Sequence, residues 1–185
     1  MRVIAAILIS GVVAGQAQAS ALIPQHWYLP AKPGQWCAYP SEIAWQKASD
    51  ANFLSDSASA YVVDGQVRSL RFFRSDEGGD WGLTDDYALS DSKVTGLTRT
   101  YNSFAKGRVV DDFVMQDGRL VRIGRRYFTM YDEPAKPKKG VDYDAHMPVY
   151  TRLDTMPFYH VILDKPATGA ICKPATPDSR AKPRA

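Results

Sequence analysis

The sequence has few of the residues from which catalytic and metal sites are usually built. Its 185 residues include two cysteines and three histidines, and no G-x-S-x-G, H-E-x-x-H, P-loop or dinucleotide-binding fingerprint occurs. The glutamates are only Glu42, Glu77 and Glu133, and the other acids are aspartates. Glutamate suits helices and aspartate suits turns, so this bias is typical of a β-rich chain. The missing motifs favour a non-catalytic protein that needs no cofactor, and enzyme activity stays open.

Long apolar runs are also missing, apart from one stretch at the start of the chain. Residues 3–15 are apolar or small, but they are fewer than the ~20 residues that a membrane-spanning helix needs. Arg2 precedes this stretch, and an Ala-x-Ala motif at residues 17–19 follows it. These features are typical of a signal peptide at residues 1–19, cleaved before Ser20. We therefore expect a periplasmic or secreted protein without a transmembrane segment.

The sequence has no strong excess of either charge. Removal of Arg2 with the signal leaves 22 basic residues (23 minus 1) against 20 acidic ones, a net charge of +2. This balance does not indicate a nucleic-acid partner. Residues 20–172 have a length that fits one domain. Residues 173–185 are rich in proline, lysine and arginine, and we expect a disordered tail there.

The two cysteines, Cys37 and Cys172, lie near opposite ends of the expected domain. In an oxidising compartment they most simply form one disulfide bond. The alternative is a pair of metal ligands or redox groups, which the lack of a C-x-x-C motif disfavours.

The clearest structural signal is a β-hairpin over residues 107–131. Two runs rich in valine, isoleucine and aromatic residues flank Asp117-Gly118, a pair that suits the positive φ angles of a two-residue type I′ turn. The apolar residues change face after Ile123, which indicates either a β-bulge at residues 124–126 or a strand buried on both faces.

Similar runs predict an antiparallel meander that forms a curved sheet or a small β-barrel. We expect strands at residues 60–63, 66–74, 87–89, 94–104, 108–116 and 119–131, with two more possible at 149–153 and 158–163. One short helix is predicted at residues 41–48, where Ser41 can cap the first turn. Residues 20–40 contain four prolines and are expected to be irregular.

Two short motifs resemble those of lipocalins. Residues 34–36 (Gly-Gln-Trp) resemble the G-x-W motif of that family, and residues 84–87 (Thr-Asp-Asp-Tyr) resemble its T-D-Y motif. The interval between them is shorter than the family's strands need, and Asp86 is an extra residue. The chain is therefore not assigned to the lipocalins, and the resemblance only favours a barrel.

Aromatic residues in the N-terminal arm form one candidate ligand site. Trp27, Tyr28, Trp36 and Tyr39 could provide a stacking platform for a sugar ring or another flat ligand. The alternative, which we favour, is that these side chains pin a proline-rich arm onto the sheet.

The best candidate metal site is Asp142, Asp144 and His146. In an extended segment these side chains share one face and could bind a divalent metal, with His26 or His160 completing the site. The alternative is a polar loop, because two carboxylates and one histidine fall short of a complete zinc set. The acidic loop at residues 75–86 offers oxygen ligands for calcium, but it lacks the helix-loop-helix spacing, and a solvated loop is favoured.

Many of the predicted strands carry arginine, which could line an anion-binding surface. These residues are Arg68, Arg71, Arg74, Arg99, Arg108, Arg119, Arg122, Arg125 and Arg126. The same region holds enough aspartate for cross-strand ion pairs to be the default interpretation. Together these patterns favour an exported, non-catalytic protein that binds a small ligand, a glycan or an envelope component. The alternatives are a metal-dependent hydrolase and an inhibitor-type module that binds another protein.

Overall fold

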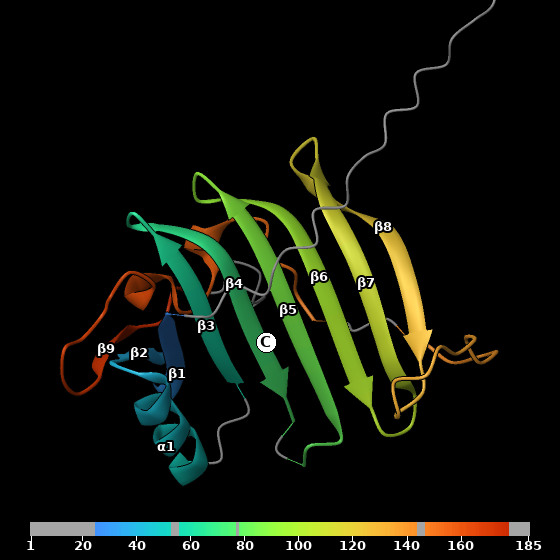
Figure 1. The fold of residues 1–185 in the computed structure, drawn as a ribbon, viewed down its shortest axis with the longest axis horizontal. Helices are drawn as coiled ribbons and strands as arrows, with labels where there is room; N and C mark the ends of the chain where they lie inside the picture. The colour runs from blue at the N-terminus through green and yellow to red at the C-terminus, as the bar shows by residue number, and fades with distance from the viewer. Residues whose placement is uncertain (1–24, 53–55, 77, 144–146, 178–185) are drawn as a thin grey trace, which may run out of the picture.

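The structure is a computed structural model that describes residues 25–52, 56–76, 78–143 and 147–177. The predicted signal peptide and residues 178–185 lie outside the described residues. Within them, nine strands form one antiparallel sheet in the order β8-β7-β6-β5-β4-β3-β1-β2-β9 (Figure 1). The strands are β1 (His26–Lys32), β2 (Gln35–Tyr39), β3 (Asp56–Val63), β4 (Gln66–Ser75), β5 (Trp81–Ser90), β6 (Lys93–Ser103), β7 (Gly107–Gln116), β8 (Arg119–Phe128) and β9 (Ile171–Pro174).

The expected curved antiparallel sheet is confirmed, and the sheet is open. Strands β8 and β9 form its two edges and do not pair with each other in the described part of the chain. The barrel alternative, which the lipocalin-like motifs favoured, is therefore wrong.

Short turns carry the meander from β3 to β8. At the central turn Asp117 has a φ of 49° and Gly118 a φ of 75°, as a type I′ turn requires. The pairing then slips at Ile123, because Phe113 pairs with Arg122 while Asp112 pairs with Gly124. The bulge interpretation is confirmed, one residue before the predicted position.

The expectation of an irregular segment at residues 20–40 is wrong, because β1 and β2 form a hairpin there. Pro33-Gly34 closes it, and Gly34 has a φ of 75°, an arrangement typical of type II turns. Pro30 pairs with Trp36 of β2 and lies next to a shift in the register between Pro30 and Lys32. Proline within a sheet is tolerated at such irregular positions.

The predicted helix is confirmed and is longer than expected. Helix α1 spans Glu42–Asn52, and the Ser41 hydroxyl accepts a hydrogen bond from the Ala44 N–H at 3.2 Å. This is the N-cap contact that the sequence predicts. Residues 49–52, which are polar except for Ala51, continue the helix. Among the described residues no helix is long and apolar enough to cross a membrane.

Residues 149–163 form loops and two 3₁₀ helices, η1 (Leu153–Thr155) and η2 (Tyr159–Val161), so the two strands considered there are wrong. The apolar side chains recur at irregular intervals of one to three positions rather than at every second position. The buried ones are Tyr150, Leu153, Met156, Phe158, Val161 and Ile162. We call residues 147–163 the covering segment, because they pack on one face of the sheet.

The predicted disulfide bond is confirmed. Cys37 of β2 and Cys172 of β9 are direct partners across the two strands, with an S–S distance of 1.99 Å. The bond fixes the edge strand β9 to the sheet. Strand β9 continues past Cys172 through Pro174, so the ordered region extends beyond the boundary expected from composition.

Candidate ligand-binding groove

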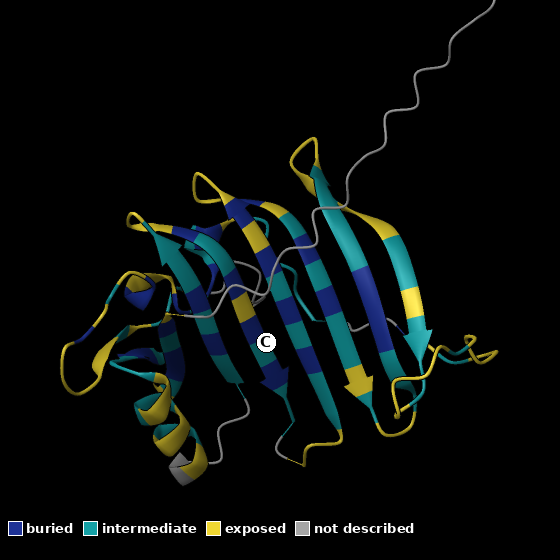
Figure 2. Cartoon of the chain, viewed as in Figure 1, coloured by how far each residue is buried: buried dark blue, intermediate teal, exposed yellow. Residues whose placement is uncertain are grey.

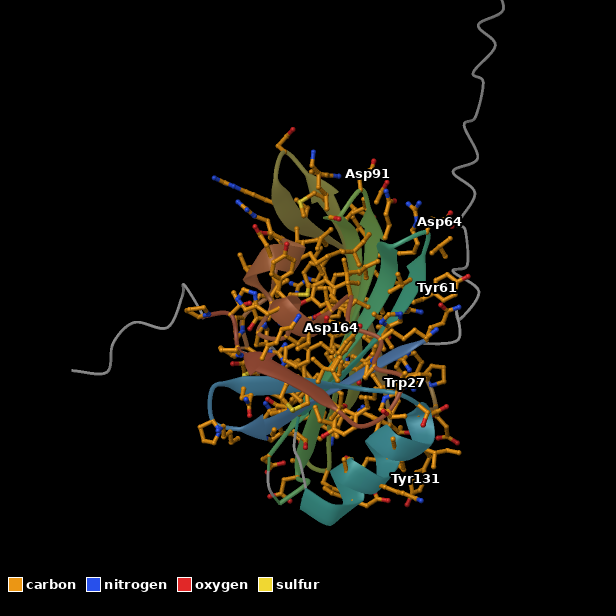
Figure 3. The ribbon with its side chains drawn as sticks, turned by 90° about the vertical axis from the view of Figure 1, so that its left-hand side faces the viewer. Trp27, Tyr61, Asp64, Asp91, Tyr131 and Asp164 are labelled. Atoms are coloured by element: carbon orange, nitrogen blue, oxygen red, sulfur yellow. A yellow bond between two sulfur atoms is a disulfide. The ribbon has the colours of Figure 1, made fainter. Side chains whose placement is uncertain are left out.

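The core lies between the covering segment and the face of the sheet that it packs on, which we call the inner face. Figure 2 shows the strands banded by burial, as expected where alternate side chains point to opposite faces. Seen edge-on in Figure 3, the sheet lies on one side and the covering segment on the other. Phe158 occupies the centre, with ring centroids 6.0 Å from Tyr28, 5.1 Å from Trp36 and 5.2 Å from Phe72.

A buried ion network crosses the inner face at the centre of the sheet. Asp85 on β5 is fully buried. Its carboxylate accepts hydrogen bonds from Arg99 Nε at 2.6 Å, Arg99 Nη2 at 2.7 Å and Arg74 Nη2 at 2.5 Å. Burial by itself would lower the pKa of Arg99, but the hydrogen bonds and charge of Asp85 raise it above its ordinary value. Arg99 therefore stays charged against the Asp85 carboxylate.

The same network holds the start of the covering segment. Arg99 donates from Nη1 to the Met147 carbonyl at 3.0 Å and from Nη2 to the Pro148 carbonyl at 3.1 Å. The Tyr150 N–H donates to the Tyr87 hydroxyl at 3.3 Å. The Met147 and Pro148 carbonyls therefore have hydrogen-bond partners where the segment crosses the sheet, which offsets the cost of removing them from water. The network is closed off from solvent, so we assign it a structural role.

A groove opens at one end of the inner face, with a volume of about 640 Å³. Its floor is formed by Val67, Val94, Leu153 and Ile162, each at most 5% exposed. Glycines and polar residues of the three hairpin turns form one rim. The lining residues are Gly65, Val67, Asp91, Ser92, Lys93, Val94, Met115, Gly118, Thr151, Arg152, Leu153, Asp154, Tyr159, Ile162 and Leu163.

The rim of the groove carries charges that largely cancel. Arg152 pairs with Asp154 through both carboxylate oxygens. Asp91 lies in the turn between β5 and β6, and Lys93 is the first residue of β6. Figure 3 shows Asp91 at the end of the sheet, beyond the covering segment. Leu163 and Tyr159 stay partly exposed at the mouth. An apolar floor with a small number of polar groups at the rim is the usual make-up of a small-molecule site, and the volume lies within the roughly 300–1,000 Å³ range of such sites.

No family model, no curated protein and no solved structure matches this chain. Any function has therefore to be inferred from the geometry and chemistry of the described residues.

The four aromatic residues of the N-terminal arm do not gather at one surface. Tyr28 and Trp36 are buried in the core, where the Tyr28 hydroxyl donates to the Ile162 carbonyl at 2.5 Å. Burial, with a smaller effect of the nearby Asp164 charge, raises the pKa of Tyr28 well above its ordinary value. Trp27 and Tyr39 are half-buried and are paired across β1 and β2. This arrangement supports the interpretation that these side chains pin the arm to the sheet.

The candidate metal residues are only partly placed. Asp142 is exposed, and its carbonyl accepts a hydrogen bond from Lys106 Nζ at 2.5 Å, whereas Asp144 and His146 lie outside the described residues. His26 is buried at the start of β1, and His160 is exposed in η2. In the described part of the chain, no three histidine, cysteine or acidic side chains are grouped as a metal would need.

The loop proposed at residues 75–86 is shorter than expected, because β5 begins at Trp81. Asp85, considered as a solvated loop acid, faces the core instead. A sequence signal for this was present: Asp85 lies in phase with Leu83, Tyr87 and Leu89 at every second position, so its side chain must share their buried face. The groove residues carry no comparable signal, because they come from turns, strand ends and the covering segment, which are far apart in the sequence.

Proposed function

We propose that this protein is an exported, non-catalytic binding protein that holds a small, mainly apolar molecule in the groove. The observation that carries the proposal is the apolar floor of a groove of about 640 Å³ at the end of the inner face. Most affinity in such sites comes from apolar burial, and the few polar groups set orientation. Arg152 and Asp154 form hydrogen bonds to each other. This supports a role for the rim in orienting a ligand rather than in reacting with it.

Export is part of the proposal. It is supported by the signal-like residues 1–19 and by the disulfide bond between Cys37 and Cys172, because such bonds persist in oxidising compartments. The alternative of a hydrolase using Asp142, Asp144 and His146 has no observation in its favour. The experiments below distinguish our proposal from the alternative of a protein-binding module.

The first test asks whether the protein carries a ligand. Native mass spectrometry of protein purified from the exported fraction is compared with a denaturing, non-reducing spectrum. We expect a mass excess in the native spectrum that disappears on denaturation and has the size of a small organic molecule. The denatured mass should also correspond to a chain that begins at Ser20. A retained signal peptide would contradict export.

The second test places the ligand in the groove. Leu163, 57% exposed, lines the mouth, so Leu163→Ala should leave the fold intact and remove part of the apolar contact. The substitution removes three carbons, each of which contributes about 0.8 kcal/mol when it is fully buried against a ligand. Because the side chain stays half-exposed, we halve the sum and expect a loss of about 1 kcal/mol in binding free energy. The binding of dodecanol or dodecanoate should therefore weaken roughly fivefold. The measurement is isothermal titration calorimetry.

The matched control is Ile43→Ala. Ile43 is also exposed, but it lies on α1 and does not line the groove. Its replacement should leave the affinity unchanged. Equal losses in both variants, or no binding of either probe to the unaltered protein, would remove the proposal and favour a protein-binding module.

A further inference from the structure

A second pocket lies at the other end of the strands. It is formed where β5 begins, where β6 turns into β7 and where the chain leaves β8, and its volume is about 250 Å³. In Figure 3, Tyr131, next to the pocket residues Met130 and Asp132, lies at the opposite end from Asp91 of the groove. We call this second pocket the end pocket. Its lining residues are Gly79, Asp80, Trp81, Gly82, Asn102, Ser103, Phe104, Gly107, Arg108, Met130 and Asp132.

The end pocket combines an exposed aromatic side chain with polar groups. Phe104 is 68% exposed, and its N–H donates to the Asp80 carbonyl at 3.3 Å, which fixes the turn beside the start of β5. A phenylalanine exposed to this extent offers the flat, apolar face of its ring to a ligand. The volume is just below the roughly 300–1,000 Å³ of drug-sized ligand sites. These features suit a small, flat-faced ligand with polar substituents.

The backbone around the pocket is shaped by glycine. Gly107 has a φ of 81°, and a Cβ atom there would lie 2.5 Å from the Phe128 carbonyl oxygen. A larger residue would therefore displace the start of β7 from the end of β8. The close approach brings Arg108 next to Asp132, and these two side chains form the polar wall of the pocket.

The charges at the end pocket disfavour an anionic ligand. Arg108 Nη1 lies 3.1 Å from Asp132 Oδ1, and its guanidinium carbon lies 4.4 Å from the centre of the Phe128 ring. The Arg108 guanidinium group therefore contacts Asp132 on one side and the Phe128 ring on the other. Asp80 adds a second carboxylate, so the three ionisable side chains of the lining sum to a charge of −1. Carboxylates and guanidinium groups in this setting hydrogen-bond well to neutral hydroxyl groups.

We infer that the end pocket binds one neutral sugar ring, which stacks on Phe104 while its hydroxyls bond to Asn102, Arg108 and Asp132. Aromatic stacking supplies the apolar contact, and the Arg108–Asp132 pair supplies both a donor and an acceptor without a net preference for an anion. The site is separate from the groove, and the inference does not depend on the groove ligand.

The test is an NMR titration of ¹⁵N-labelled protein with N-acetylglucosamine, glucose, glucuronate and glucosamine. We expect saturable shifts with the neutral sugars at the amides of Gly82, Asn102 and Phe104. Phe104→Ala should weaken this binding by about three- to tenfold, the range that an aromatic contact supplies. Ile123→Ala is the matched control, because Ile123 is also an exposed apolar side chain and does not line the pocket.

A second variant separates a binding role from a structural one. Asp132 has a φ of 63°, which asparagine adopts as readily as aspartate, so Asp132→Asn should keep the turn. It removes the carboxylate that neutralises Arg108. We therefore expect weaker binding of N-acetylglucosamine and a gain in binding of glucuronate, a swap that a change in fold would not produce.

Three results would overturn the inference. The first is the absence of saturable shifts with any neutral sugar in the unaltered protein. The second is equal affinity in Phe104→Ala and Ile123→Ala. The third is tighter binding of glucuronate or glucosamine than of N-acetylglucosamine to the unaltered protein, which would make the ligand an ion.

Discussion

Replacement of Asp85 by alanine should destabilise the fold more than replacement of any other acid on β5. The change leaves Arg74 and Arg99 buried without their carboxylate, since Asp85 accepts hydrogen bonds from both. Removing one partner from a buried ion pair costs about 3–5 kcal/mol, because the remaining charge is left uncompensated. Domains are stable by only about 5–15 kcal/mol, so Asp85→Ala should lose a large share of the total.

Asp86 provides a control on the same strand. It pairs with Arg71 through two hydrogen bonds, at 2.7 and 3.1 Å, but on the opposite face, where the two side chains are 39% and 59% exposed. Exposed pairs of this kind contribute about 0.2–1 kcal/mol. The two variants therefore remove the same chemistry from adjacent positions and differ mainly in burial.

The assay is equilibrium unfolding in urea, followed by circular dichroism and by tryptophan fluorescence. If Asp85→Ala does not fold, Asp85→Asn, which keeps the size of the side chain and one acceptor, gives a measurable intermediate loss. Equal free energies of unfolding for the Asp85→Ala and Asp86→Ala variants would refute the reasoning. So would a loss below about 1 kcal/mol for Asp85→Ala, since that is the scale of exposed pairs.

Two further changes act on other parts of the fold. Replacing both Cys37 and Cys172 with serine opens a loop with a sequence separation of 135, and the chain-entropy model predicts a loss of about 5 kcal/mol, measured by the same urea titration; unchanged stability would contradict that model here. Burial, with a smaller effect of Lys165, lowers the pKa of His26 below its ordinary 6.5. The unfolded chain then takes up a proton that the native state resists, so stability should be complete above pH 6.5 and fall as the pH drops below it. His26→Gln should flatten this dependence, and an identical pH profile would show that another group causes it.

The sequence predicts those parts of the fold that depend on short-range chemistry or on composition alone. Asp117-Gly118 sets its own turn because both residues adopt positive φ, and Ser41 caps α1 through a contact three residues away. Cys37 and Cys172 were paired by elimination, since a chain with two cysteines has one possible disulfide. None of these predictions required knowledge of what lies across the sheet.

The predictions that were wrong concern positions whose conformation depends on contacts with residues far away in the sequence. Pro30 is expected to break a strand, but it is tolerated next to a register shift in the pairing of β1 with β2. Tyr150 and Ile162 read as strand residues, but their backbone groups bond to the hydroxyls of Tyr87 and Tyr28 instead of to another strand. Tertiary contacts override local propensity at such positions. The groove and the end pocket lie at hairpin turns, where no periodic pattern marks a site.

The position of the groove follows from a mismatch between the two layers of the domain. A sheet with an apolar face needs a second layer to cover it, and here an irregular segment with two short 3₁₀ helices takes that place. The segment packs its apolar side chains on the centre of the sheet, and the hairpin that carries Asp91 extends past it (Figure 3). Val67 and Val94, each 2% exposed, are buried at this end and form the apolar floor of the groove. The groove lies between the hairpin turns and the covering segment, and a small apolar ligand would fill the space that the second layer leaves there.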